Sequence, residues 1–339
     1  MHKILIIGPS WVGDTMLMQT MLMRLKQRHP ESRIDVLAPP WTAALLRTMP
    51  QVSEVIINPF PHGALQLVAR YRLGVQLRAA RYDQAIVLPN SFKSALVVFF
   101  ARIPLRTGFV GEARYGLLND IRWLNKSRLP LMVERYAQLA ETKHGDIPRP
   151  LKYPRLEISA AQRDATLRKL GLIPNQPIAV FCPGAEYGPA KRWPVAYFAE
   201  IAQRLQQRGY AVWLIGSAKD KEVAECIIAL GNPNCKNLCG STDLPDAIAL
   251  LSCAKLIISN DSGLMHLAAA LDIPMLALFG SSSAQFTPPL SVHAQVLNID
   301  IACSPCFQRE CPLGHFNCMM KLIPDLVWKK LQQIDHNLT

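Results

Sequence analysis

The sequence has no apolar run near the roughly 20 residues that a membrane-spanning helix requires. The longest candidate, residues 94–101, is short and lies between Lys93 and Arg102. The apolar start at Ile4–Ile7 ends at Gly8-Pro9, after too few residues for the core of a signal peptide. We therefore expect a buried first strand and a protein that stays in the cytoplasm.

Two common phosphate-binding fingerprints are also missing. No G-x-G-x-x-G follows the first strand of either half, and Gly13 is followed by Asp14 rather than by Lys-Ser/Thr. These absences argue against a nicotinamide-dependent oxidoreductase and against a P-loop. Aromatic residues make up only 7% of the chain and no basic stripe recurs, so nucleic acid is not an expected partner.

The first 181 residues contain no cysteine, and all nine cysteines lie from Cys182 onward. Four of them follow the pattern Cys303-x-x-Cys306-x4-Cys311-x6-Cys318, which is typical of metal ligands. Buried thiols and disulfides are the other open interpretations and are favoured over a metal because the loop is short, although the odd total argues against a complete disulfide framework. Because the segment lies away from the loops considered below, we assign no metal to the active site.

The net charge of +12 comes from the first half of the chain. Residues 1–155 hold 22 lysines and arginines against 10 carboxylates, whereas residues 156–339 hold 15 of each sign. An excess confined to one half predicts an acidic partner for that half. Nucleic acid, a membrane surface and a phosphorylated substrate all satisfy this charge.

Short apolar strands alternate with segments of helical length in both halves, which predicts an α/β protein with two doubly wound parallel sheets. Three prolines in residues 148–154 mark a linker. We predict one domain at 1–155, a second at 156–323, and a C-terminal helix within 324–339 that crosses back to the first. Such folds bind ligands at the carboxyl ends of their strands, so a cleft between the halves is expected.

The loop after the first strand, Gly8–Asp14, offers a candidate base. A carboxylate there can take a proton from an incoming hydroxyl. An aspartate at a helix start also has an ordinary role as a cap or first-turn residue, and its position alone does not separate the two roles.

Three loops of the second half suit a nucleotide. Pro183–Pro194 combines small residues with Lys191 and Arg192 ahead of a helix, which is typical of a diphosphate site. Asn260–His266 leads a strand into a helix whose first amides can bind phosphate. Gly216–Asp220 ends a strand where a carboxylate often holds a ribose, although this signal is weak.

Together these segments resemble the ADP-heptose:lipopolysaccharide heptosyltransferases, glycosyltransferase family 9. The resemblance extends in order over nearly the whole chain, from Gly8–Asp14 through Pro89–Ala95, Arg114–Asp120 and Leu131–Tyr136 to Phe286–Leu290. It implies a GT-B fold, with two Rossmann-like domains facing across a cleft, and inversion at the anomeric carbon. The implied donor is ADP-L-glycero-D-manno-heptose, and the implied acceptor is the first heptose of the anionic Kdo-lipid A inner core of lipopolysaccharide.

The resemblance also implies roles for individual residues. Asp14 corresponds to the catalytic base, and Lys191 to the lysine that contacts the donor diphosphate. The other expected donor contacts are Gly184, Ser217, Asp220, Asp261, Ser262, Gly263 and His266. We predict the acceptor contacts to be Ser10, Trp11, Lys93, Arg106, Arg114 and Arg122, the basic ones chosen by charge and location. No cofactor is expected, because protein cations and helix amides can stabilise the leaving diphosphate without a metal.

Such an enzyme would contact the cytoplasmic face of the inner membrane peripherally. The alternatives that remain are a related heptosyltransferase and a non-hydrolysing nucleotide-sugar epimerase. The epimerase would share the fold and the donor but would not require a one-sided basic half.

Overall fold

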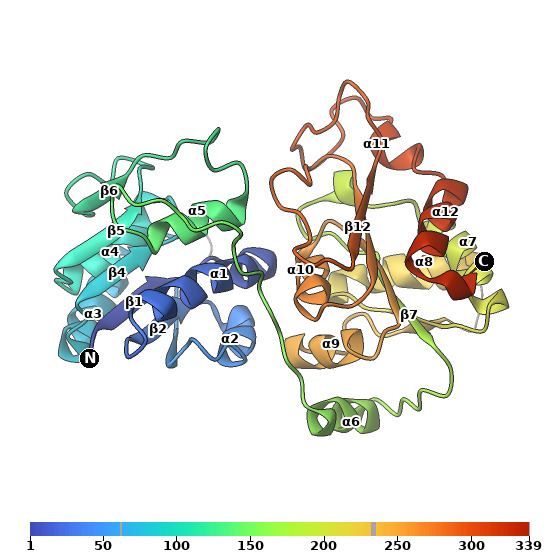
Figure 1. The fold of residues 1–339 in the computed structure, drawn as a ribbon, viewed down its shortest axis with the longest axis horizontal. Coiled ribbons are helices and arrows are strands. Elements are labelled where there is room, and N and C mark those ends of the chain that lie inside the picture. Colours follow the sequence, from blue (N-terminus) through green and yellow to red (C-terminus); the bar gives the residue numbers. More distant parts are fainter. Residues whose placement is uncertain (62, 232–234, 339) are drawn as a thin grey trace. The chain divides into compact units, whose positions relative to one another are not determined.

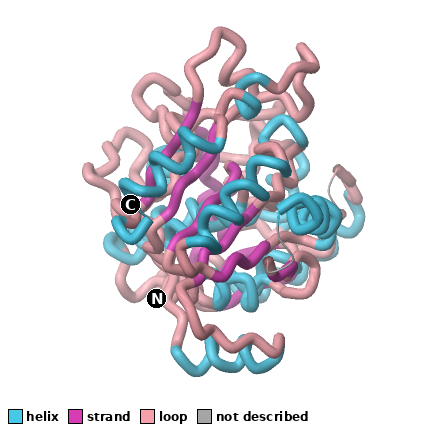
Figure 2. Tube along the Cα trace, turned by 90° about the vertical axis from the view of Figure 1, so that its right-hand side faces the viewer, coloured by secondary structure: helices cyan, strands magenta, loops and turns pink. Residues whose placement is uncertain are grey.

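The computed structural model describes residues 1–61, 63–231 and 235–338. The chain divides into two compact units, Met1–Pro154 and Arg155–Thr339 (Figure 1). In each unit the helices pack around a parallel sheet, and Figure 2 shows the strands lying among helices and loops. No helix within the described ranges is both long and apolar enough to cross a membrane.

The first unit contains a six-stranded sheet in the order β3-β2-β1-β4-β5-β6, in which every described pair is parallel. The two central strands are apolar apart from their first residues, Lys3 and Gln84, as expected for strands with helices on both faces. Its elements are β1 (Lys3–Ile7), α1 (Val12–Arg28), β2 (Arg33–Ala38), α2 (Pro40–Arg47), β3 (Glu54–Ile57), α3 (Leu67–Leu77), η1 (Arg78–Ala80), β4 (Gln84–Val87), α4 (Phe92–Phe100), β5 (Leu105–Phe109), β6 (Asp120–Arg122) and α5 (Met132–Leu139).

The second unit repeats this plan with the strand order β12-β11-β10-β7-β8-β9, again parallel throughout. Its helix α12 packs against α7 and β11 within the same unit. The elements are α6 (Ala160–Lys169), β7 (Ile178–Cys182), η2 (Pro189–Lys191), α7 (Val195–Gln207), β8 (Ala211–Leu214), η3 (Ala218–Asp220), α8 (Lys221–Gly231), β9 (Lys236–Asn237), α9 (Leu244–Leu251), β10 (Leu256–Asn260), α10 (Gly263–Ala270), β11 (Met275–Phe279), β12 (Ala294–Asn298), α11 (Asn317–Met320), α12 (Pro324–Ile334) and η4 (His336–Leu338).

The predicted fold class, two doubly wound α/β units of the GT-B type, is confirmed. The sequence gives little sign of β5, β6 and α5, because Arg, Gly, Asn and Pro are scattered from Arg106 to Tyr153. In the structure this stretch completes one end of the first sheet and supplies α5, which packs along α1. That packing matters for the candidate base on α1.

Candidate active site

In each unit the parallel strands bring their following loops to one edge of the sheet, where ligands of doubly wound folds bind. The first unit places the loop after β1 and the loop after β4 at that edge. The second unit places there the loops after β7, β8, β10 and β11. The loops selected from the sequence are therefore neighbours within their own units.

Asp14 lies in the first turn of α1, whose N-cap residue is Trp11. The cap side chain makes no hydrogen bond to the helix start. The hydroxyl of Tyr136, on α5, donates a hydrogen bond to the Asp14 carboxylate. Burial, followed by the charge and hydrogen bond of Asp14, raises the pKa of Tyr136 well above its usual value. Tyr136 therefore stays a neutral donor that holds the carboxylate in place.

The other residues predicted in this loop border the start of α1. Trp11 is exposed, and its carbonyl accepts hydrogen bonds from the amide and the hydroxyl of Thr15. The carbonyl of Ser10 accepts a hydrogen bond of 2.8 Å from the indole of Trp41. Asp14 thus follows a loop whose carbonyls accept hydrogen bonds from Thr15 and from the exposed indole of Trp41.

Arg114, a predicted acceptor contact, is a buried side chain in the structure. Its guanidinium donates to the carbonyls of Pro89 and Phe109 and to the side chains of Ser94 and Asn90. Burial lowers its pKa to about 10. These bonds tie the loops after β4 and β5 together, which is a structural task.

The remaining predicted cations differ in how far hydrogen bonds, ion pairs and burial occupy their charged groups. Arg106 donates to the carbonyls of Ile103 and Leu117, both at 2.6 Å, and burial lowers its pKa. Lys93 is half-buried in the first turn of α4. Arg122 ends β6, where its guanidinium is paired with Asp120. Of these cations, only Arg122 lines a pocket described below.

Three of the predicted donor contacts meet in the second unit. The ammonium of Lys191, at the end of η2, lies 2.5 Å from a carboxylate oxygen of Asp261, which is 5% exposed. His266 is buried beside them, and burial lowers its pKa to about 4, so its ring is neutral. Its Nδ1 has no hydrogen-bond partner in the described part of the chain. The ammonium of Lys191 keeps two further donors for a ligand.

The start of α10 lies next to this cluster. Ser262 is its N-cap residue and makes no side-chain cap bond, so the first amides of the helix, from Gly263 onward, are free of such a cap. Asn260, at the end of β10, braces the neighbouring loop by donating to the carbonyl of Pro183 and accepting from the amide of Trp193. Uncapped amides beside a lysine suit an anion.

Gly184 and Asp220 fit together in a way the sequence does not reveal. A Cβ on Gly184 would lie 2.3 Å from Cγ of Asp220, so only glycine fits against that carboxylate. The carboxylate accepts bonds from the amide and hydroxyl of Ser217, at 2.9 and 2.8 Å, and caps η3. Close packing and hydrogen bonds thus hold three predicted donor contacts together in one corner of the second unit, namely Gly184, Ser217 and Asp220.

The four clustered cysteines surround a small cavity of about 40 Å³ together with His315. They lie close enough to influence one another, because the other three contribute to raising the pKa of Cys318 after burial. All nine cysteines are free thiols, and the described residues contain no group of three ligands arranged to hold a metal. The disulfide interpretation therefore finds no counterpart in this structure.

Several side chains that the sequence did not single out border these sites. Tyr136 holds Asp14, and the ring of Tyr187 lies 5.1 Å from the ammonium of Lys191. The hydroxyls of Ser281 and Ser282, after β11, are buried and have no partner within the described ranges. A run of serines after a strand was the available signal for the last two. The two tyrosines lie in stretches that carry the family resemblance, Leu131–Tyr136 and Pro183–Pro194, but neither of them was assigned a role from the sequence.

Taken together, the second unit has a lysine, helix amides and a neutral histidine that can bind an anion, and the first has a carboxylate that accepts a hydrogen bond from a buried tyrosine. Two doubly wound units with these groups define a glycosyltransferase of the GT-B type, which uses a nucleotide-sugar donor.

Comparison with known proteins narrows this class. Residues 70–317 match the family model described as glycosyltransferase family 9 (heptosyltransferase). The chain is 48% identical to lipopolysaccharide heptosyltransferase 2 of Salmonella typhimurium over 98% of both chains. It is 46% identical to lipooligosaccharide heptosyltransferase 2 of Haemophilus ducreyi, over 98% of this chain and 99% of that one. The solved structure of Escherichia coli ADP-heptose lipopolysaccharide heptosyltransferase II superposes with a TM-score of 0.89 at 46% identity, with 98% of each chain covered.

The chain belongs to glycosyltransferase family 9, the heptosyltransferases. The resemblance deduced from the motifs is confirmed, and the protein is a glycosyltransferase.

Proposed function

We propose that this glycosyltransferase transfers L-glycero-D-manno-heptose from its ADP derivative to the first heptose of the Kdo-lipid A inner core, with inversion. The similarity to heptosyltransferases of the second type, at 46 to 48% identity over nearly the full length, supports this acceptor. The observation that carries the chemistry is the pairing of Asp14 with the buried Tyr136 hydroxyl. A carboxylate held in this way is positioned as a general base.

The residues of the second unit account for the leaving group. As the bond from the sugar to the diphosphate breaks, negative charge develops on the diphosphate oxygens. The two free donors of Lys191 and the first amides of α10 can stabilise that charge, with Asp261 fixing the direction of the ammonium. His266, being neutral, can donate or accept one hydrogen bond without adding charge. This set makes a metal cofactor unnecessary.

The acceptor belongs to the first unit in this proposal. Its excess of basic residues suits the carboxylates and phosphates of an inner core, and suits peripheral contact with the anionic cytoplasmic face of the inner membrane. Ser10, Trp11 and Lys93 stand closest in sequence to the loops after β1 and β4 and remain proposed contacts. We withdraw Arg114 from the proposed contacts because it is buried and both of its terminal nitrogens donate to carbonyls or side chains of its own unit.

The test is ADP release from ADP-heptose in the presence and absence of the acceptor. We expect acceptor-dependent release, and expect Asp14→Asn to abolish it while calorimetric binding of ADP-heptose survives, because the amide cannot accept the proton. Turnover by Asp14→Asn near the normal rate would show that Asp14 is only a first-turn residue of α1.

The sequence alone also left open a non-hydrolysing epimerase, which membership of glycosyltransferase family 9 does not support. It would consume the nucleotide sugar without any acceptor and would release an epimer rather than a glycoside. The dependence of ADP release on acceptor therefore separates the two activities.

A further inference from the structure

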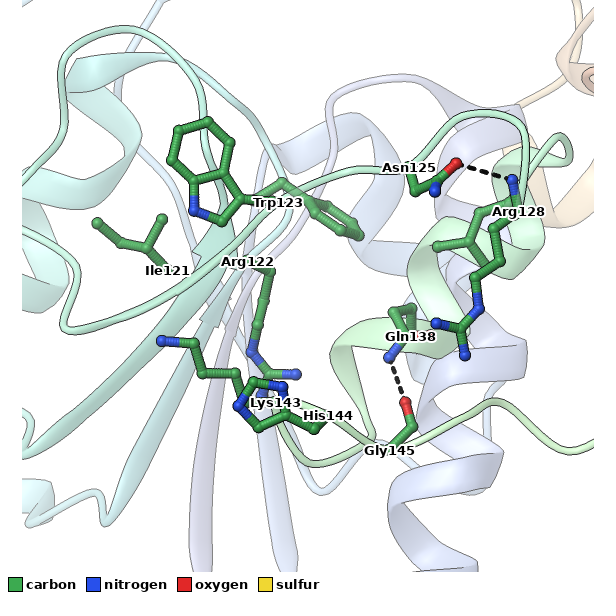
Figure 3. A pocket seen from close by; sticks show the side chains of 11 residues that line it. Ile121, Arg122, Trp123, Asn125, Arg128, Gln138, Lys143, His144 and Gly145 are labelled. Carbon is green, nitrogen blue, oxygen red and sulfur yellow. Dashed lines mark hydrogen bonds between the residues drawn. The ribbon is translucent and has the colours of Figure 1, made fainter.

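A cavity of about 280 Å³ opens beside the carboxyl end of β6 in the first unit (Figure 3). Its volume suits a sugar-sized group. Its walls come from β5, β6, the loop that follows β6, helix α5 and the segment after α5. The lining residues are Phe109, Ile121, Arg122, Trp123, Asn125, Arg128, Leu129, Gln138, Lys143, His144 and Gly145.

Arg122 lines this cavity, and one of the three nitrogens of its guanidinium has no hydrogen-bond partner among the described residues. Its Nε and Nη2 donate to the two carboxylate oxygens of Asp120 at 2.8 and 2.7 Å, and Nη2 also donates to the carbonyl of Glu141. The residue is only 6% exposed, and Nη1 is buried with no partner among the described residues. A buried charged donor without a partner is costly, so a ligand acceptor at Nη1 would be strongly favoured.

The cavity carries further positive charge. Lys143 and His144, on the segment that follows α5, line the same cavity, and Figure 3 shows the ammonium of Lys143 pointing away from the guanidinium of Arg122. Lys143 is exposed and makes no ion pair or hydrogen bond with the part of the chain that the structure describes. Arg128, on the far side, pairs with Asp146 outside the cavity. No carboxylate is among the described residues that line the cavity, so its charge is positive.

The lining of the cavity also includes apolar side chains. The indole of Trp123 is 73% exposed, although the residue directly follows a strand. Ile121 and Leu129 line the cavity as well. An exposed indole and several cations in the lining of one cavity match a ligand with one ring face and one acidic group.

We propose that this cavity binds the acidic group of a sugar in the acceptor, a carboxylate or a phosphate, with Arg122 and Lys143 on the anion and Trp123 under the ring. This inference rests on the proposed function and names the part of the acceptor that the cavity recognises. An oxyanion in the cavity can accept a hydrogen bond from Nη1 of Arg122, and the ammonium of Lys143 adds positive charge to the same cavity.

The location of the cavity indicates that the bound sugar is not the one that receives the heptose. In the sheet order, β6 lies three strands from β1, which is about 14 Å at the usual strand spacing. The cavity is therefore too far from Asp14 for the sugar that receives the heptose, and it suits an acidic sugar farther along the acceptor. Binding energy at such a remote group fixes the reacting hydroxyl in position.

Helix α5 connects the two places. Tyr136 on this helix holds Asp14, and Gln138, two residues later, lines the cavity and donates to the carbonyl of Gly145 at 2.8 Å. Two residues correspond to about 200° around a helix, so the residues face opposite sides. One rigid helix thus sets the position of the base and one wall of the proposed subsite.

The test compares Lys143→Gln and Trp123→Ala with a matched control, Arg81→Gln. Arg81 is an exposed cation of the same unit, at the amino-end edge of the sheet just before β4. We expect Lys143→Gln and Trp123→Ala each to raise the acceptor KM about 5- to 10-fold, as expected for one partly exposed charge-assisted contact. The donor KM and the melting temperature should stay unchanged, and the control should keep the normal acceptor KM.

Two acceptors identify the acidic group. One is the complete heptosyl-Kdo-lipid A, and the other is a phosphate-free heptosyl-Kdo oligosaccharide. A loss seen with both assigns the cavity to a Kdo carboxylate, and a loss confined to the complete acceptor assigns it to a phosphate. An unchanged acceptor KM in both variants, or the same loss in Arg81→Gln, overturns the proposal.

Failure of the proposed function gives a different result. If the unaltered protein transfers no heptose to either acceptor, the function is wrong. Calorimetric titration with the oligosaccharide alone then tests whether the cavity binds an acidic sugar. Binding that weakens in Lys143→Gln but not in Arg81→Gln supports the proposed subsite, and equal or absent binding in both variants refutes it.

Discussion

The hydrogen bond between Tyr136 and Asp14 predicts how the pH dependence of transfer responds to one removed atom. Tyr136→Phe deletes the hydroxyl and leaves the buried ring that packs α5 on α1. In the native protein the carboxylate raises the pKa of Tyr136, and by reciprocity the hydroxyl favours the ionised carboxylate. Without it, Asp14 should hold its proton to a higher pH.

The size of the expected shift in the pH profile follows from the charge of the Asp14 carboxylate, which accepts the hydrogen bond. Hydrogen bonds to charged groups contribute about 1.5 to 3 kcal/mol when their partner is lost. Asp14 is only partly buried, so water can replace part of the lost bond, and the lower end of that range applies. Since about 1.4 kcal/mol corresponds to one pH unit, the acidic limb of the profile should move up by about one unit.

The assay is kcat/KM for acceptor as a function of pH, which reports the free enzyme's essential base. Tyr71→Phe is the matched control, because Tyr71 is exposed and its hydroxyl has no partner in the described ranges. A limb that moves only in Tyr136→Phe supports the base assignment. If the limb stays in place while transfer continues normally, Tyr136 does not govern the base, and Asp14 loses its strongest support.

Three further outcomes follow from the second unit. Gly184→Ala places a Cβ 2.3 Å from the Asp220 carboxyl carbon, so we expect ADP to bind at least about 10-fold more weakly by calorimetry; unchanged affinity would separate this corner from the donor site. Burial depresses the pKa of His266 from 6.5 to about 4, so its contribution to stability is complete above pH 6.5 and is lost as the pH falls towards 4. The melting temperature should drop over that window by the equivalent of at most about 3 kcal/mol, and His266→Gln should flatten the drop, whereas an identical drop in the variant would contradict the assignment. Transfer should persist after treatment with a chelator, and its loss would show that protein cations do not suffice.

The sequence predicts the parts of the fold that are regular. Continuous apolar runs such as Ile178–Phe181 and Leu256–Ile258 have the signature of strands buried on both faces, and the structure places β7 and β10 there. Edge strands carry no such signature. β6 is three residues long and contains the ion-paired Asp120 and Arg122. It therefore lacks the apolar run that would identify it as a strand in the sequence.

The donor loops could be found because each joins a strand to a helix and carries residues suited to an anion. Lys191, Asp261 and His266 indeed meet, although Lys191 lies 70 residues before Asp261 in the chain. The pairing of Gly184 with Asp220 could not be foreseen, because it depends on the packing of two loops.

Charge alone misled the choice of acceptor residues. Arg114 and Arg122 look alike in sequence, and both are buried. Each guanidinium donates several hydrogen bonds within its own unit and leaves one buried nitrogen without a partner among the described residues, Nε in Arg114 and Nη1 in Arg122. Of the two, Arg122 lines the cavity beside β6 and Arg114 does not, so the position beside a cavity separates the structural arginine from the candidate ligand-binding one.

The most direct test of the proposed function is mass analysis of the product. The protein is incubated with ADP-L-glycero-D-manno-heptose and heptosyl-Kdo-lipid A, and the acceptor is recovered and weighed by mass spectrometry. We predict an acceptor heavier by one heptosyl residue, formed by the unaltered protein and not by Asp14→Asn. An acceptor of unchanged mass, with the protein folded and ADP-heptose bound, would contradict the proposed transfer.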